Sequence, residues 1–370
     1  MKVIVLSGIN LFEGGPLSVY HDFLRNMIGQ GYHKKNKIIA FVHKKELFNE
    51  FIEYDNINFI ELPESRTSYI FRLWYEFVYF YFFSKKRSID IWISLHDITP
   101  NVVADKRYVY CHNPSPFMEK NLRNFKYSYK TSLFSLFYKY LYRINIKRNT
   151  DVIVQHDWIR EKFKEFYNIE NVIVAKPSMD FDVVTYITGD KAGNKEKIKF
   201  IYPAYPRVFK NIEVICSACL NLEERNITGF EVLLTIDGTE NNYSREIFEK
   251  YKDLSNLNFI GLQPRKNIFQ LYDEVDYLIF PSKLETWGLP ISEFKITDKP
   301  IILADLPYAH ETLGTYHSSC FFNPNKPEEL ELIIENILKG DQSQFKKTFE
   351  QKIEEPYCPD WNALLEMILA

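Results

Sequence analysis

The sequence predicts an α/β protein built from two parallel-sheet domains. At 370 residues the chain exceeds what one hydrophobic core usually holds. Short apolar runs of strand length alternate with helical stretches along its whole length. A polar stretch rich in Gly, Asn and Lys, from Gly189 to Lys197, interrupts this alternation. We therefore expect a first domain over residues 1–180, a second over residues 181–355, and a terminal helix over residues 356–370.

The first domain begins with a predicted strand, Lys2 to Ser7, followed by a turn containing Gly14 and Gly15 and then by a helix. Glycines allow a backbone to approach an anion closely, and the start of a helix supplies free N–H donors. A Gly-Gly pair alone is a weak signal, and a tight turn without a ligand is the alternative. Further strands of this domain are predicted at residues 37–42, 57–62, 89–94, 106–111, 151–154 and 172–176.

The stretch from Tyr69 to Phe83 is almost entirely aromatic or aliphatic, interrupted by Arg72 and Glu76. It is too short to span a bilayer. We expect a helix buried in the domain. The alternative is a helix at a membrane interface, because Lys85-Lys86-Arg87 follows it.

One histidine has a position that suggests a binding role. His112 comes directly after the predicted strand Lys106 to Cys111 and is followed by Asn113 and Pro114. A side chain just beyond the carboxyl end of a strand should point into the cleft between the domains rather than into the core. A structural histidine is the alternative.

The second domain repeats the alternation, beginning with a strand over residues 198–202. Arg207 and Lys210 follow, at the start of a helix that runs to Glu224. Arginine can neutralise a diphosphate by a bidentate fork and lysine as a point charge, whereas solvated surface cations are the alternative. Further strands are predicted at residues 230–236, 257–260, 277–280, 299–304 and 319–322, with helices at residues 268–276 and 327–338.

The most informative stretch runs from Pro281 to Glu293, after the apolar strand that ends at Phe280. Pro290 is well placed in the first turn of a helix, so the stretch should be a strand, a loop and a helix start. The loop amides and the positive end of that helix would face an anion beyond the strand end. Glu285 lies in the loop and Glu293 is expected in the first helical turn. Two carboxylates beside an anion site suggest a sugar nucleotide.

This order of strand, Pro-Ser, Glu285, Gly-Leu-Pro and Glu293 resembles the nucleotide-sugar signature of glycosyltransferase family 4. A Glu-x7-Glu pair alone would be weak, because two solvated glutamates produce it readily. The resemblance covers essentially the full chain and is strongest over residues 199–322. It implies retaining enzymes of the GT-B fold, in which two Rossmann-like domains face each other across a cleft and a terminal helix packs back on the first domain.

The resemblance also implies roles for individual residues. Lys210 and Arg207 would neutralise the departing diphosphate, although the family usually has a wider gap between the two. Glu285 would hold sugar hydroxyls and the ion-like transition state, Glu293 the ribose, and His112 the donor sugar or the acceptor. The residues expected to bind the donor are Gly14, Gly15, Asp237, Leu262, Thr286, Trp287, Gly288, Leu289 and Glu293.

These roles imply a retaining glycosyltransferase of the hexosyltransferase type. Its donor would be a UDP-, GDP- or ADP-sugar and its acceptor a saccharide, expected to be a lipid-linked intermediate of bacterial surface polysaccharide such as O-antigen or capsule. A soluble small-molecule acceptor is the alternative. Two other classes share the fold: a sugar-nucleotide epimerase, and a lectin or scaffold without activity.

The charge distribution favours an anionic partner on the first half of the chain. Residues 1–185 carry 26 Lys and Arg against 20 Asp and Glu, and the remainder carry 20 against 29. Between Lys106 and Arg148 the only acid is Glu119, and aromatic residues separate the cations. An anionic membrane surface fits this pattern, solvated charges are the alternative, and the donor-site motif argues against nucleic acid.

The composition predicts the cytoplasm, with peripheral association at the inner face of the cytoplasmic membrane as an extension. The five cysteines are an odd number without framework spacing, no signal peptide precedes the first strand, and no run of 18 apolar residues occurs. We expect no cofactor and no metal. Asp180-Phe-Asp182 has metal-binding spacing, but it follows Pro-Ser-Met at a linker instead of capping a strand.

Overall fold

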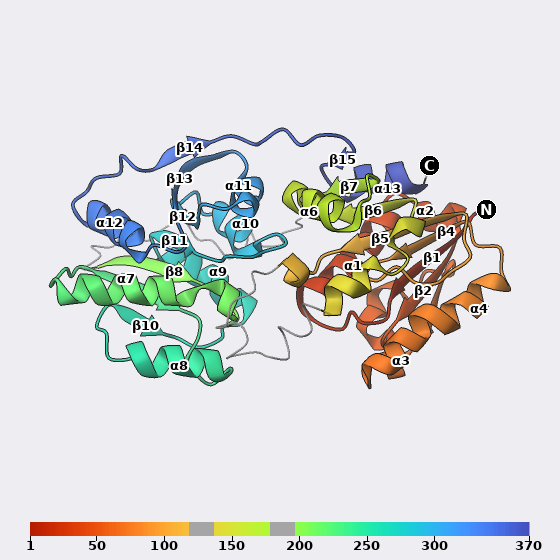
Figure 1. Ribbon diagram of the computed structural model, residues 1–370, viewed down its shortest axis with the longest axis horizontal. Coiled ribbons are helices and arrows are strands. Elements are labelled where there is room, and N and C mark those ends of the chain that lie inside the picture. Colours follow the sequence, from red (N-terminus) through yellow and green to blue (C-terminus); the bar gives the residue numbers. More distant parts are fainter. Residues whose placement is uncertain (118–136, 178–196, 370) are drawn as a thin grey trace. The chain divides into compact units, whose positions relative to one another are not determined.

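The computed structural model describes residues 1–117, 137–177 and 197–369. These residues form two compact units, each built around its own sheet (Figure 1). Unit 1 contains residues 1–117, 137–177 and 353–369, and unit 2 contains residues 197–352. The expected linker, with Asp180 and Asp182, lies outside the described residues, as does Lys130 of the basic segment.

Unit 1 is built on a sheet that has eight strands within the described residues, in the order β15-β7-β6-β5-β4-β1-β2-β3, and every neighbouring pair is parallel. Ile4 and Leu6 pack into one cluster and Val5 into another, so both faces of the central strand are covered. The strands are β1 (Val3–Gly8), β2 (Lys37–Val42), β3 (Ile57–Glu61), β4 (Ile91–Ser94), β5 (Lys106–Cys111), β6 (Asp151–Val154), β7 (Val172–Ala175) and β15 (Tyr357–Cys358).

Helices pack on both faces of this sheet. Residues 137–143 are also helical and are followed by η5 (Ile146–Arg148). The remaining helices of unit 1 are α1 (Gly14–Gly29), α2 (Tyr32–Lys35), η1 (Lys45–Phe51), η2 (Pro63–Arg66), α3 (Tyr69–Trp74), the π-helical turn η3 (Tyr75–Tyr79), α4 (Phe80–Lys85), η4 (Ser115–Phe117), α6 (Asp157–Tyr167) and α13 (Trp361–Leu369).

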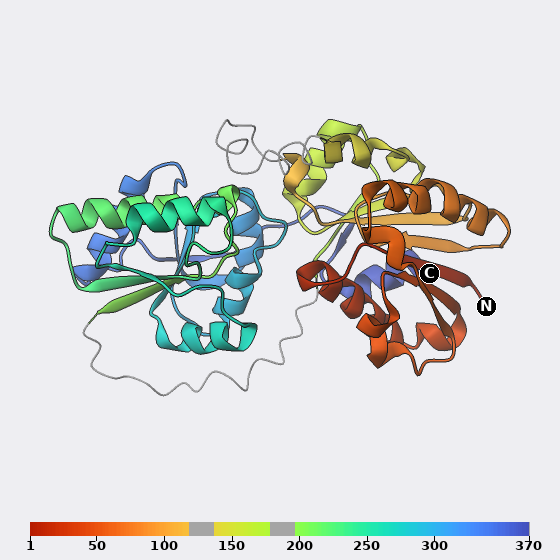
Figure 2. The same cartoon turned by 90° about the horizontal axis from the view of Figure 1, so that it is seen from below.

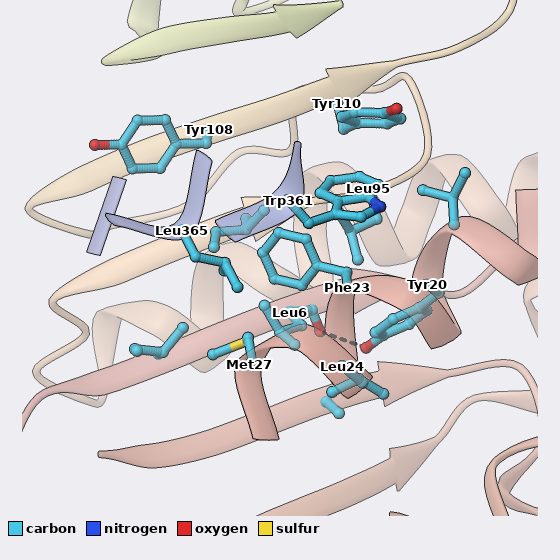
Figure 3. Packing of buried hydrophobic residues seen from close by; sticks show 14 of the residues in the cluster. Leu6, Tyr20, Phe23, Leu24, Met27, Leu95, Tyr108, Tyr110, Trp361 and Leu365 are labelled. Carbon is cyan, nitrogen blue, oxygen red and sulfur yellow. Dashed lines mark hydrogen bonds between the residues drawn. The ribbon is translucent and has the colours of Figure 1, made fainter. Parts of the chain in front are cut away.

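The helix at the carboxyl end, α13, belongs to the core of unit 1. Trp361 is 1% exposed and lies between Phe23 of α1 and Tyr110 of β5, with ring centroids 5.5 and 5.3 Å away (Figure 3). Leu365 packs into the same cluster. The chain therefore returns from unit 2 to complete the core that its first residues began.

Residues 69–85 form a nearly continuous helix that buries charged side chains and exposes apolar ones. Its two charged residues before Lys85, Arg72 and Glu76, are buried, whereas Ile70, Phe71 and Trp74 are exposed. The expectation of a buried helix is therefore wrong for its outer face. The charged side chains face inward because the neighbouring loop supplies hydrogen-bonding partners for them, such as the His96 carbonyl.

Unit 2 has a sheet with seven strands within the described residues, in the order β10-β9-β8-β11-β12-β13-β14; all pairs are parallel except β13 with β14. Its strands are β8 (Ile198–Tyr202), β9 (Phe230–Leu234), β10 (Leu257–Phe259), β11 (Tyr277–Phe280), β12 (Ile301–Ala304), β13 (Tyr316–Phe322) and β14 (Lys346–Thr348). Its helices are η6 (Val208–Lys210), α7 (Ile212–Glu224), α8 (Asn242–Tyr251), α9 (Arg265–Glu274), α10 (Leu289–Lys295), α11 (Pro307–Leu313) and α12 (Pro327–Leu338).

In each sheet the order of strands reverses at one point. In unit 2 the chain leaves β8 toward β9 and β10 on one side, and leaves β11 toward β12 and β13 on the other. In unit 1 the same reversal separates β1 from β4. Ligands of open α/β sheets bind beyond the carboxyl ends of the strands at such points. The predicted α/β fold class is confirmed, and the loops after β8 and β11 become the first place to look for a site.

Replacing Trp361 by alanine should destabilise unit 1 by about 3–5 kcal/mol, because the vacated space is enclosed by well-packed side chains. Hydrogen exchange of the β1 and β4 amides measures this loss in unit 1 alone. Met367→Ala, on the exposed side of the same helix, is the matched control and should have little effect. Equal protection in both variants would show that α13 does not belong to this core.

Candidate functional site

The loops that follow β8 and β11 are joined by hydrogen bonds to backbone carbonyls. The Lys283 N–H donates to the Phe209 carbonyl at 2.7 Å, and the Ser282 hydroxyl reaches the same oxygen at 3.3 Å. The Asn211 amide donates to the Pro281 carbonyl at 3.2 Å. These bonds fix the two loops to each other before any ligand arrives.

This junction brings Lys210 and Glu285 into an ion pair, in which the lysine ammonium contacts Oε1 of the glutamate. The two side chains are 17% and 12% exposed, so the pair is largely shielded from water but still reachable. The Tyr202 hydroxyl donates a hydrogen bond to the Lys210 carbonyl at 2.9 Å. Two residues predicted from distant parts of the chain therefore meet at the carboxyl edge of the sheet.

Two buried tyrosines lie near this pair. Burial, with a smaller contribution from the Glu285 carboxylate, raises the pKa of Tyr202 and of Tyr308. Both hydroxyls therefore remain neutral donors at physiological pH. Tyr308 uses its hydroxyl to hold the Ser282 carbonyl at 2.6 Å, which fixes the loop that carries Glu285.

The start of α10 depends on Gly288. Its φ is +77°, and a Cβ there would lie 3.1 Å from Ile291 and 3.5 Å from the Phe280 ring. A side chain at this position would be both strained and crowded, so glycine allows the tight entry into the helix. Leu289 begins the helix and is exposed, and Pro290 lies in its first turn, as expected.

Trp287 fixes the rest of this loop. Its carbonyl accepts a bond from the Thr312 hydroxyl, and its indole N–H donates to the Ser292 hydroxyl at 3.1 Å. The ring itself is buried, while its neighbour Thr286 is partly exposed. Trp287 therefore holds the loop in place, and Thr286 is the more accessible of the two predicted donor-binding side chains.

Glu293 does not lie where the sequence placed it. Since α10 begins at Leu289, Glu293 belongs to the second turn, and the expectation of a first-turn carboxylate is wrong. Its side chain is buried, 3.2 Å from the Arg265 guanidinium and 3.5 Å from the Tyr272 hydroxyl. Burial raises the pKa of Glu293, and Arg265 and Tyr272 partly offset that rise.

Three further residues of unit 2 lie in loops at the strand ends. Arg207 precedes η6 and is exposed, with its guanidinium 5.9 Å from the Tyr205 ring. Hydrogen bonds from the Thr239 hydroxyl and amide lower the pKa of Asp237. The loop after β10 approaches that carboxylate at Gly261, and the next residue, Leu262, is largely exposed.

In unit 1, Gly14 and Gly15 open α1 after the first strand. Gly14 has a φ of +64°, whereas Gly15 does not need a left-handed backbone, and a Cβ at either position would meet nothing within 4 Å. Neither packing nor backbone strain within unit 1 requires glycine at position 15. A glycine there would still allow a ligand to approach the backbone closely, as the sequence analysis expects.

His112 lies at the end of β5 and is held by a residue that the sequence analysis missed. Asp97, after β4, has a φ of +75° and is buried. Its carboxylate accepts bonds from the His112 N–H at 2.8 Å, the Asn113 N–H at 3.1 Å and the Tyr142 hydroxyl at 2.7 Å. The His112 imidazole lies 3.8 Å from the same carboxylate. Asp97 is the third residue after β4 ends at Ser94, and an aspartate just beyond an apolar strand was the signal that could have identified it.

The structure thus brings Lys210, Glu285 and the Gly288 loop together in unit 2, while His112, Gly14 and Gly15 lie at the corresponding edge of unit 1. Among the described residues, no three His, Cys, Asp or Glu side chains are grouped in a way that could hold a metal ion. In the same residues, no helix is long and apolar enough to cross a membrane.

Residues 187–354 match the family described as glycosyl transferases group 1. Most of the matched residues lie in the second unit, which is therefore similar to that family. This similarity favours the expected enzyme class, and the finer assignment to family 4 with its Glu-x7-Glu signature stays a prediction. Over 251 residues the chain is 21% identical to the O-antigen chain mannosyltransferase RfbU of Salmonella typhimurium, covering 66% of this chain and 60% of that protein.

Solved glycosyltransferase structures share the fold of this chain at low sequence identity. Sucrose-phosphate synthase from Thermosynechococcus elongatus superposes with a TM-score of 0.64 at 13% identity, covering 92% of this chain and 90% of that one. WaaG, a glycosyltransferase involved in lipopolysaccharide biosynthesis, gives 0.61 at 14% identity, with coverages of 91% and 90%. Anabaena HepE in complex with UDP and glucose gives 0.59 at 12%, with 93% and 92%. The GT-B fold is thereby shown.

The environment of Glu293 predicts a pH-dependent effect of Glu293→Gln. Because the pKa is raised in the folded protein, ionisation above the ordinary pKa disfavours the folded state, and at lower pH both states are protonated. Glutamine should therefore raise the melting temperature at neutral pH, and the gain should vanish as the pH falls below about 4.5. The exposed Glu224→Gln is the control and should not change stability. A loss of stability at neutral pH would mean that the Arg265 contact outweighs burial.

Proposed function

We propose that this protein is a retaining hexosyltransferase that moves a sugar from a nucleotide diphosphate sugar to a saccharide acceptor. The observation that carries the proposal is the Lys210–Glu285 pair at the switch point of the second sheet. Lys210 is a cation that can bind the diphosphate of the donor, and the adjacent Glu285 is a carboxylate that can accept hydrogen bonds from the hydroxyls of its sugar.

The reaction needs charge stabilisation more than covalent chemistry. As the bond from the sugar to the diphosphate breaks, negative charge develops on the departing phosphate. Lys210 would offset that charge, assisted by Arg207 and the loop amides around Gly288. Since α10 has only seven residues, these groups rather than the helix dipole would provide most of the compensation. Before the donor binds, Lys210 is occupied by Glu285, so binding exchanges one anionic partner for another.

Each of the other predicted residues would then bind a different part of the donor or the acceptor. Glu285, released from Lys210, would accept bonds from sugar hydroxyls and stabilise positive charge on the ring. Glu293 would hold the ribose, for which the exposed Arg265 can move aside more easily than the buried Tyr272. His112 and Gly15 of unit 1 would contact the donor sugar or the acceptor.

Retention at the anomeric carbon is part of the proposal. A covalent glycosyl-enzyme would need a carboxylate at the rear face of that carbon. The sequence nominates no such residue, so attack from the front, assisted by the leaving phosphate, is favoured. Comparing the anomeric configuration of donor and product by NMR tests this step, and an inverted product would contradict it.

The names of similar proteins support the choice of acceptor. One is an O-antigen chain mannosyltransferase and another is involved in lipopolysaccharide biosynthesis. We therefore propose a lipid-linked saccharide of bacterial surface polysaccharide, with a soluble small-molecule acceptor as the alternative. The exposed cations Arg143, Lys147 and Arg148 of unit 1 suit an anionic acceptor of this kind.

A donor screen tests the proposed class of reaction. Purified protein is incubated with radiolabelled UDP-, GDP- and ADP-sugars, with and without EDTA, and slow hydrolysis is measured in the absence of acceptor. One donor should be hydrolysed and EDTA should make no difference, since we propose that the protein needs no metal. Conversion of a sugar nucleotide into its epimer would instead identify an epimerase.

Lys210→Ala should lower turnover of the identified donor by about 100-fold or more, which is the scale of losing one preorganised charge stabiliser. Lys339→Ala, which removes a largely exposed lysine from the surface of unit 2, is the control and should retain full activity. Circular dichroism and melting temperature verify that the Lys210 variant is folded. Unchanged turnover at saturating donor would contradict the role of Lys210.

A further inference from the structure

The helix of residues 69–85 carries none of the residues assigned to the transfer reaction. Both views show α3 and α4 at the outside of unit 1, with η3 between them (Figures 1 and 2). The outer face of this helix carries a set of exposed apolar side chains, and Ile70 among them is 79% exposed. We call this set the apolar face; it consists of Tyr69, Ile70, Phe71, Trp74, Val78 and Phe82.

The inner face of the same helix anchors it firmly. The Arg72 guanidinium donates to the His96 carbonyl at 3.3 Å and to the Tyr138 hydroxyl at 3.2 Å. The Glu76 carboxylate lies 2.8 Å from the His96 imidazole, and both side chains are buried. Because of these buried polar contacts, the helix cannot roll to hide its apolar face without separating Arg72 and Glu76 from the groups around them.

The apolar face itself carries no charged side chain, and three cations follow its carboxyl end, whereas the exposed Glu64 and Arg66 precede its other end. From Thr67 to Ser84 no charged side chain is exposed, and then Lys85, Lys86 and Arg87 follow, all exposed. No acidic side chain is exposed between Thr67 and Ser88. An apolar face that contains tryptophan and tyrosine and ends in cations is the composition of helices that lie in the interface of an anionic bilayer.

The neighbouring helix extends this composition. Tyr138, which the Arg72 guanidinium contacts, belongs to helical residues 137–143, and Leu73 and Phe77 pack against the same cluster. Beside the buried Tyr138, this helix exposes Phe137, Tyr140 and the cation Arg143, and Ile144 directly after it is also exposed. Two adjoining helices of unit 1 thus combine exposed aromatics with cations.

We propose that the apolar face of residues 69–82 docks unit 1 onto an anionic lipid surface. The apolar side chains would enter the boundary between headgroups and acyl chains, and Lys85, Lys86 and Arg87 would contact the headgroups. This proposal deepens the proposed function, because it gives the enzyme a way to reach a lipid-linked acceptor, and to that extent it rests on it. A second copy of the chain or a protein partner would not require cations at the end of the face.

Trp74 offers a direct readout of docking. All five tryptophans lie in the described residues, and Trp74 is the one that is largely exposed. The full-length protein is floated with vesicles of phosphatidylcholine alone or mixed with phosphatidylglycerol, without donor or acceptor. We expect flotation with the anionic vesicles, with a blue shift of tryptophan fluorescence and quenching by brominated lipid. Trp74→Phe should abolish both optical changes while flotation persists.

Matched variants distinguish binding through the apolar face from non-specific binding of exposed apolar side chains elsewhere. The triple variant Ile70→Ser, Phe71→Ser, Trp74→Ser should lower the vesicle partition coefficient about tenfold or more, because three apolar side chains no longer leave water. The control variant Ile52→Ser, Leu332→Ser, Met367→Ser removes three comparably exposed apolar side chains elsewhere and should float like the wild type. Lys85→Glu with Lys86→Glu should weaken binding to anionic vesicles only.

Several results would overturn the proposal. They are absence of flotation, equal flotation of the triple variant and the wild type, and flotation without a change at Trp74. Self-association of the wild type in sedimentation, lost in the triple variant and unaffected by vesicles, would assign the face to a second copy instead. Because the assay contains no donor, failure of docking and failure of sugar transfer remain distinguishable.

Discussion

The contact between Lys210 and Glu285 depends on two loops that hold each other through hydrogen bonds to backbone carbonyls. Phe209 and Pro281 supply carbonyls to Lys283 and Asn211 across the junction, so the ion pair sits on a prearranged frame. Preorganised charges need no reorganisation while charge develops during bond cleavage. The frame exists because β8 and β11 are neighbours at the point where the strand order reverses. Sheet topology thus decides which two residues, 75 positions apart, become chemical partners.

Much of this could be predicted from the sequence. Strands such as β2, β5, β6 and β8 each end in a run of buried apolar residues, and their bounds agree with the predicted ones because strands buried on both faces leave a simple pattern. The loop from Pro281 to Glu293 was identifiable because it combines a glycine before a helix with a proline in the first helical turn. In the structure Gly288 has a φ of +77° and Pro290 lies in the first turn of α10. Lys210, Arg207 and Glu285 were predicted as site residues because they are charged and follow strand ends. The sequence did not show which of them are in contact.

What the sequence could not supply was the partner of each polar group. The position of Asp97 beyond a strand end was visible in the sequence, but its bonds to the His112 and Asn113 amides were not. Glu293 fell in the second turn because helix starts are uncertain by a residue or two. The helix of residues 69–85 was harder still. Its apolar character suggested burial, but the two buried charges, Arg72 and Glu76, found partners inside and turned the apolar side outward.

The pair at the centre of the site has a consequence that binding measurements can test directly. If Lys210 exchanges Glu285 for the donor diphosphate, then Glu285→Gln should strengthen binding of the free nucleoside diphosphate, because the lysine no longer has a competing anion. Calorimetric titration of the wild type, Glu285→Gln, Lys210→Met and the double variant measures this. The gain from Glu285→Gln should disappear when Lys210 is also replaced. If Glu285→Gln does not strengthen binding, or if its gain persists without Lys210, the diphosphate does not bind at Lys210.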